Sequence, residues 1–277
     1  MNKRLFRRVI NLLLVLAGIY GLIVAGMYFG QRKLMYVAGD ERPFRSAYGA
    51  EDAEAVSLRT ADGLELLAWY WPALSEDGFT VVYLHGNAGH IGNRVEKARP
   101  YLAAGLGALL VEWRGYAGNP GSPTEEGFAA DARAALAFLE GRGIRDGRML
   151  LYGESIGSGP AVRLAVERAA ENRTVGAVVL EAPFTSAAAV AQAHYPWLPA
   201  YWLVRDRHDS LAWIDRIGAP LLILHGALDR VVPARMGRAL HEAALEPKRI
   251  RIWPEAGHND LYEHGAAETV LDFLAAL

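Results

Sequence analysis

Residues 149–166 read MLLYGESIGSGPAVRLAV, and this stretch decides the fold. An apolar run at 149–152 leads into the motif G-E-S-I-G at 153–157, and a run typical of a helix follows. A strand that turns sharply into a helix can expose a serine hydroxyl beside a base, and flanking glycines allow such a tight turn. The pattern predicts Ser155 as a nucleophile, whereas Ser158 falls inside the predicted helix. A glycine-rich connector is the alternative.

Strand-like and helix-like segments alternate on both sides of this motif. Continuously apolar runs suit parallel strands that are buried on both faces. An opening hairpin with an Asp-Gly turn is predicted at 55–60 and 64–71, and the helices include 124–140 and 156–170. Further strands are predicted at 79–84, 106–112, 148–152, 175–180, 220–224 and 249–253. We expect one α/β domain over 51–277, with a mostly parallel central sheet and helices on both faces.

An acid and a base follow two later predicted strands. Asp229 comes just after the run 220–224, and His258 comes just after the run 249–253. The chain order of serine, acid and histidine is the one that such a strand-to-helix turn uses. We expect His258 to take the proton of Ser155 as general base, and Asp229 to orient the imidazole. The alternative for Asp229 is a turn or helix cap before Val-Val-Pro.

An acyl-transfer site also needs hydrogen-bond donors for the oxyanion. The backbone N–H of Ile156, directly after the nucleophile, is one candidate. The backbone N–H of Asn87, in the loop HGNAG at 85–89, is the other, although Asn87 also suits a plain turn. His85 and His225 each end a predicted strand before a glycine, and we expect them to be structural or to support the residues of the triad.

The N-terminal segment is typical of a membrane protein. Residues 9–30 are apolar except for Asn11, and as a helix they would extend roughly 33 Å, enough to cross a hydrocarbon core. The residues Lys3, Arg4, Arg7 and Arg8 precede them. We predict an uncleaved anchor at 1–33 and a connector at 34–50. The alternatives are a signal peptide with a weak cleavage site at 24–26 and a buried helix, although this run has no polar face.

The orientation across the membrane follows from the flanking charges. The basic N-terminal flank favours a cytoplasmic N-terminus and an external domain, periplasmic in a bacterium. Positive charge on the other flank, at Arg32 and Lys33, weakens this preference.

A segment rich in aromatic residues interrupts the strand–helix alternation at 184–213. It contains Tyr195, Trp197, Tyr201, Trp202 and Trp213. One interpretation is a short helix pair that packs on the core. The other is a cap over a site at the carboxyl ends of the strands, where open α/β sheets bind ligands.

Composition excludes several classes of protein. The chain has 277 residues, 52% of them hydrophobic, and a net charge of −2, which gives no basic footprint for nucleic acid. It contains no cysteine, so thiolate metal sites, iron–sulfur clusters and cysteine nucleophiles are excluded. No His-Glu-x-x-His motif occurs, and no Gly-x-Gly-x-x-Gly follows the first parallel strand. We expect no metal and no cofactor.

From about residue 51 to the C-terminus, the chain resembles the α/β-hydrolase superfamily. The motifs that carry the resemblance are HGNAG at 85–89, Arg-Gly-Tyr at 114–116, GESIG at 153–157, Ala-Leu-Asp at 227–229 and Gly-His at 257–258. With the apolar N-terminus and QRKLMY at 31–36, the chain resembles single-pass, membrane-anchored serine hydrolases related to monoacylglycerol lipases, lysophospholipases and protein depalmitoylases. The family often has Tyr or Asp ahead of Arg-Gly-Tyr, whereas Glu112 and Trp113 stand there in this chain.

The resemblance implies hydrolysis of acyl esters or thioesters, without metal or cofactor. We expect a lipid-like or small acyl ester as substrate and the membrane as partner through the N-terminal helix. A serine peptidase or amidase of the same fold is the enzymatic alternative. No motif marks a pocket for a peptide N-terminus, and acids near the predicted site such as Glu154 or Glu181 are only a hint of one. A non-catalytic, membrane-tethered binding protein is the third possibility.

Overall fold

The computed structural model describes residues 3–277, in which an eight-stranded sheet forms the centre of the fold. The strand order is β1-β2-β4-β3-β5-β6-β7-β8; β2 runs antiparallel to both of its neighbours, β1 and β4, and the remaining neighbours are parallel. The strands are β1 (Glu54–Arg59), β2 (Glu65–Trp71), β3 (Thr80–Leu84), β4 (Gly107–Val111), β5 (Met149–Glu154), β6 (Ala177–Glu181), β7 (Leu221–Gly226) and β8 (Lys248–Trp253). The predicted opening hairpin and mostly parallel sheet are confirmed.

Helices cover both faces of this sheet. On one face α3 (Glu125–Gly141), α4 (Ser158–Ala170) and α7 (Ala234–Ala243) share a core with residues such as Phe128, Val162 and Leu240. On the other face α2 (Val95–Ala103) and α8 (Ala266–Leu274) share a second core. Every residue of β3, β4, β5, β6 and β7 is buried, as expected for strands between two helical layers.

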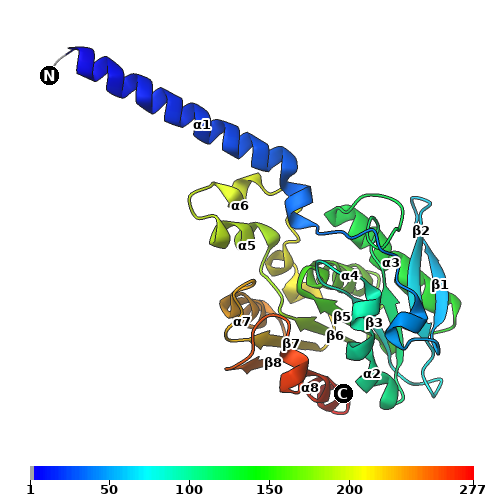
Figure 1. Ribbon diagram of the computed structural model, residues 1–277. Helices are drawn as coiled ribbons and strands as arrows, with labels where there is room; N and C mark the ends of the chain where they lie inside the picture. Colours follow the sequence, from blue (N-terminus) through cyan, green and yellow to red (C-terminus); the bar gives the residue numbers. More distant parts are fainter. Residues whose placement is uncertain (1–2) are drawn as a thin grey trace.

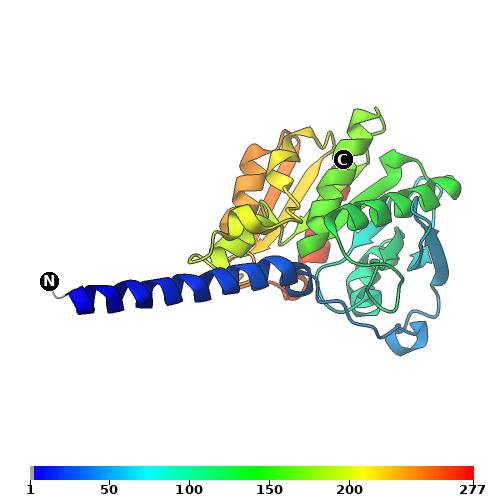
Figure 2. The ribbon, with the colours of Figure 1, turned by 90° about the horizontal axis from the view of Figure 1, so that it is seen from above.

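The N-terminal helix α1 (Lys3–Met35) stands apart from these layers. Figures 1 and 2 show it projecting away from the domain, with α5 (Ala187–His194) and α6 (Ala200–Leu203) beside its C-terminal part. It is the one helix among the described residues that is long and apolar enough to cross a membrane, and none of its residues is buried. Short 3₁₀ helices lie at Arg45–Tyr48, Ile91–Arg94, Asp146–Arg148, Ser155–Gly157, Ser210–Ala212, Ile214–Arg216 and Leu261–His264.

Candidate active site

The turn after β5 holds Ser155 in a strained backbone conformation, at φ +50°. A Cβ at Gly157 would overlap the carbonyl oxygen of Leu84, and one at Gly153 would lie 2.7 Å from the carbonyl oxygen of Gly157. Other backbone atoms therefore lie too close to these two positions for any residue except glycine. The Ser158 hydroxyl, at the start of α4, donates to the carbonyl oxygen of Ser155 at 2.6 Å and steadies the turn.

Three residues from separate loops meet at this turn. The Ser155 Oγ lies 3.1 Å from Nε2 of His258, and Nδ1 of His258 lies 2.6 Å from Oδ2 of Asp229. The other carboxylate oxygen of Asp229 accepts hydrogen bonds from the N–H groups of Val231 and Val232, at 2.8 and 2.7 Å. This arrangement can relay a serine proton to a histidine that a buried carboxylate orients.

The Asp229 carboxylate has a further neighbour in His225, for which a supporting position beside the triad was one of the two expectations. Nε2 of the buried His225 lies 2.9 Å from the carbonyl oxygen of Val232 and 3.3 Å from Oδ2 of Asp229. Burial raises the pKa of Asp229, but hydrogen bonds from His225 and His258 outweigh burial and hold that pKa below its usual value. The carboxylate is therefore ionised at neutral pH and can stabilise a positively charged His258.

Asn87 lies beside Ser155, and its side chain ties α1 to the site. Asn87 and Ile156, the two candidate oxyanion donors, line the same cavity as Ser155. The Asn87 amide donates to the carbonyl oxygen of Met35 at 2.6 Å, and its Oδ1 accepts from the Val37 N–H at 2.8 Å. This side-chain role is additional to the predicted backbone role, and it fixes the end of α1 on the loop after β3.

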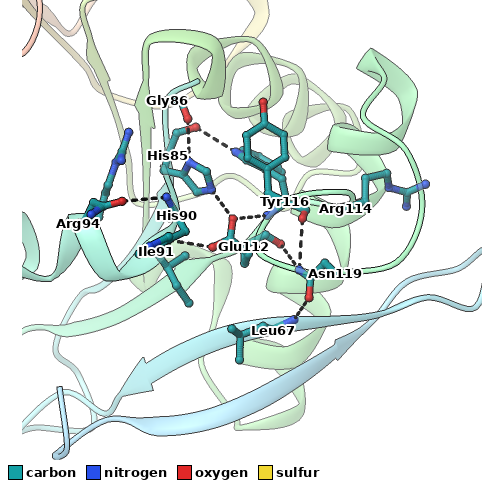
Figure 3. Close-up of polar contacts among 12 residues, drawn as sticks. Leu67, His85, Gly86, His90, Ile91, Arg94, Glu112, Arg114, Tyr116 and Asn119 are labelled. Atoms are coloured by element: carbon teal, nitrogen blue, oxygen red, sulfur yellow. Dashed lines mark hydrogen bonds and ion pairs between the residues drawn. The ribbon is translucent and has the colours of Figure 1, made fainter. Parts of the chain in front are cut away.

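A second histidine–carboxylate pair supports the same loop (Figure 3). Nε2 of His85 lies 2.9 Å from Glu112, and Nδ1 lies 2.7 Å from the carbonyl oxygen of Gly86. The other oxygen of Glu112 accepts from the N–H of Ile91 at 2.9 Å. Glu112, the departure from the usual pattern before Arg-Gly-Tyr, is fully buried and is not among the cavity-lining residues. His85 is a structural residue, as predicted.

The cavity above Ser155 has a volume of about 450 Å³ and mostly apolar walls. Part of the wall comes from Phe184, Val190 and Leu198 in the segment 184–213 that contains α5 and α6, and we call this segment the cap. Another part comes from α1, through residues that include Val24 and Met27. The N-terminal helix thus contributes directly to the candidate site.

Two acidic residues near the turn lie inside the protein and face basic partners. Glu154 pairs with Arg94 at 3.1 Å, and Glu181 pairs with Lys97 at 2.7 Å. Glu181 also accepts from the Tyr152 hydroxyl at 2.6 Å. Burial raises the pKa of Glu154, but Lys97 and Arg94 outweigh it and lower that pKa. Neither carboxylate is among the cavity-lining residues, so neither is placed to hold a peptide amine.

No group of three or more His, Cys, Asp or Glu side chains within residues 3–277 is arranged to hold a metal ion.

No protein-family model matches this chain. An uncharacterized protein of Mycobacterium tuberculosis (strain ATCC 25618 / H37Rv) is 42% identical over 241 residues, covering 86% of this chain and 84% of that protein. The lysophosphatidylserine lipase ABHD12 of Macaca fascicularis is 32% identical over 213 residues, covering 71% of this chain and 53% of the lipase. The structure of an alpha-beta hydrolase from Vibrio vulnificus is similar with a TM-score of 0.67 at 20% identity, covering 90% of this chain and 91% of that one.

Proposed function

This chain belongs to the α/β-hydrolase superfamily, and from that premise we propose that it is a serine esterase acting on acyl esters or thioesters. The observation that carries the proposal is the hydrogen-bonded series from Ser155 Oγ through His258 to Asp229, with distances of 3.1 and 2.6 Å, at an apolar cavity. No step of the proposed mechanism needs a metal or a cofactor.

The reaction would proceed through an acyl-enzyme. His258 accepts the hydroxyl proton of Ser155 while Oγ attacks the acyl carbon, and the carbonyl oxygen becomes an oxyanion that faces the N–H groups of Asn87 and Ile156. The protonated His258 then gives its proton to the departing alcohol or thiol as the bond to the acyl carbon breaks. Water, deprotonated by His258, releases the acid and restores Ser155. Asp229 remains ionised and stabilises the imidazolium.

The walls of the cavity support a substrate with one acyl chain. The lining is apolar around Ser155, and it provides side chains such as Val24, Phe184 and Leu198 against which methylene groups can pack. The relative ABHD12 is named a lysophosphatidylserine lipase, which also points to a single-chain lipid ester. We propose a lipid-like ester of this class, with shorter acyl esters as accessible model substrates.

We further propose that α1 remains attached to the mature enzyme as a membrane anchor. Gln31 and Arg32 near its C-terminal end contact the cap: Gln31 accepts from the Arg205 N–H at 2.7 Å, and Arg32 pairs with Asp206 at 2.8 Å. A helix that is only a cleaved signal needs no such contacts. The flanking charges favour a domain outside the cytoplasm.

Hydrolysis of matched substrates tests the proposed chemistry. We expect the full-length enzyme in detergent to hydrolyse a medium-chain ester faster than the matching amide, and Ser155→Ala to abolish both activities. Ser57→Ala, which changes an exposed serine on β1, is the control and should behave as the wild type. Equal or faster turnover of an aminoacyl amide would replace the proposal with a peptidase, and a folded wild type without activity would favour a binding protein.

A further inference from the structure

One face of α1 packs on the cap, and the opposite face exposes large apolar side chains. Val24, Met27 and Gln31 are partly buried, at the spacing of a single helical face. On the opposite face, Leu22 is 76% exposed and Phe29 is 82% exposed. A helix with apolar residues on all sides that meets protein along one face needs an apolar medium along the other.

The part of the cap that accompanies α1 is uncharged. Residues 182–204 contain no Asp, Glu, Lys or Arg. Within them, residues 195–202, which we call the cap tip, carry Trp197 at 55% exposure and Trp202 at 81% exposure. Exposed tryptophans on an uncharged segment are typical of a surface that enters the membrane interface.

Nearby side chains form hydrogen bonds with several backbone groups of the cap tip. The Gln192 amide donates to the carbonyl oxygen of Leu198 at 3.0 Å and accepts from the N–H of Tyr201 at 3.1 Å. The Tyr20 hydroxyl of α1 donates to the carbonyl oxygen of Trp197 at 3.1 Å. Irregular backbone can enter hydrocarbon only where other groups take the place of water in this way.

The contact with Tyr20 gives the depth of the cap tip. Basic residues bracket the apolar run, with Arg8 before it and Arg32 after it, and Gly30 is the last residue of the run. Tyr20 precedes Gly30 by about 15 Å along the helix axis. A tilt of α1 from the membrane normal brings Trp197 closer to the interface. Trp197 still lies deeper in the hydrocarbon than Gly30.

Charged residues return at the level where the apolar run ends. The Arg32 guanidinium forms two hydrogen bonds with Asp206, at 2.8 and 3.0 Å, and Arg205 and Lys33 are exposed beside this pair. This charged layer lies where lipid head groups would lie if the cap tip entered the leaflet.

We propose that the cap tip inserts beside α1 into the bilayer leaflet on the domain's side, and that the substrate reaches Ser155 from that leaflet. A single-chain lipid ester moves its tail into the cavity between α1 and the cap without passing through water. The placement of the tip rests on the geometry of α1 and the cap. The route of the substrate rests, in addition, on the proposed esterase function.

The depth of the cap tip can be measured on the full chain, because it contains no native cysteine. The experiment uses three single-cysteine variants, each with a nitroxide label and each in phosphatidylcholine–phosphatidylglycerol vesicles. They are Trp202→Cys, Leu16→Cys in α1 and Glu76→Cys in the exposed loop after β2. We expect the label at position 202 to be accessible to oxygen and shielded from an aqueous nickel complex, like the label at 16. A label at 202 as open to nickel as the label at 76 would overturn the proposed insertion.

The route of the substrate has a separate test. Trp202→Glu places a charge on the cap tip outside the cavity lining, and Trp202→Leu is the matched apolar control. We expect Trp202→Glu to slow hydrolysis of a monoacylglycerol in vesicles by about tenfold or more and to leave hydrolysis of p-nitrophenyl acetate unchanged. The leucine variant should resemble the wild type on both substrates.

Two further results would each contradict one part of the proposal. Equal losses on the two substrates would overturn entry from the leaflet. A wild type that hydrolyses neither substrate, together with a shielded label in Trp202→Cys, would refute the proposed esterase and support the membrane placement of the cap tip.

Discussion

Two histidine–carboxylate pairs that lie after parallel strands of this molecule differ in what the second ring nitrogen of the histidine meets. His258 binds Asp229 through Nδ1 at 2.6 Å, and its Nε2 faces the Ser155 hydroxyl at 3.1 Å. His85 binds Glu112 at 2.9 Å, and its other nitrogen faces the carbonyl oxygen of Gly86. The His258 side chain is 13% exposed, whereas that of His85 is 1% exposed. A histidine–carboxylate pair becomes a candidate for catalysis when its second nitrogen meets a reactive group at a cavity.

Removal of the first pair's histidine should have the largest effect on activity. We expect His258→Ala to lower kcat on a small ester by about 10⁴-fold to 10⁶-fold, because no base remains for Ser155. The thermal midpoint should change little, since Asp229 keeps its contacts with His225 and with the N–H groups of Val231 and Val232. Esterase assays and thermal unfolding of the same sample measure both quantities. A loss of less than tenfold would remove His258 from the mechanism.

Substitution of Asp229, the carboxylate of the first pair, should have the second largest effect on activity. We expect Asp229→Asn to lower kcat by about 10⁴-fold, because an amide cannot hold the required imidazole tautomer or stabilise its positive charge. The KM should change much less than kcat, since Asp229 does not line the cavity. Steady-state kinetics on a small soluble ester separates the two constants. An effect on KM alone would indicate a purely structural carboxylate.

The second pair should affect stability more than chemistry. We expect His85→Ala to lower the free energy of unfolding by about 3–5 kcal/mol, because Glu112 is left buried without its partner. The kcat of the molecules that remain folded should fall far less than in His258→Ala. Urea unfolding in detergent gives the free energy, and active-site titration gives the folded fraction. A stable His85→Ala enzyme without activity would make the two pairs equivalent and contradict the comparison.

A further buried histidine, His208, should produce a smaller, pH-dependent effect. Nε2 of His208 lies 3.1 Å from the hydroxyl of Tyr36, directly after α1, and burial lowers the pKa of His208 to about 4. The His208 imidazole is protonated near pH 6.5 in the unfolded chain, but only near pH 4 in the folded protein. Stability should therefore fall as the pH decreases from about 6.5 to about 4.

Thermal midpoints across this pH range check the expectation for the wild type and His208→Gln. The variant should lose part of the pH dependence. Identical slopes for the two proteins would assign the acid sensitivity to other groups.

The sequence predicted what depends on local patterns. Runs of apolar residues were sufficient to predict the parallel strands, and the G-x-S-x-G turn was sufficient to place Ser155 after β5. The strand ends predicted that Asp229 and His258 would lie at the same edge of the sheet, where the structure has them. The catalytic roles of these three residues remain predictions.

What the sequence could not predict depends on contacts between distant segments. The amide of Asn87 on Met35 joins residues 52 positions apart, and the hydroxyl of Tyr20 meets Trp197 across 177 positions. No spacing rule predicts such contacts, because they exist only after α1 and the cap have packed together. The pairing of Glu154 with Arg94 is a contact of the same kind. Only the structure shows that the Glu154 side chain is directed into the protein.

Covalent labelling with a fluorophosphonate, followed by mass mapping of the modified peptide, tests the central claim most directly. We predict one adduct, on Ser155, that forms in the wild type and is absent from Ser155→Ala and greatly slowed in His258→Ala. A folded wild type that stays unlabelled, or an adduct that persists in Ser155→Ala, would contradict the proposal of an activated serine at this site.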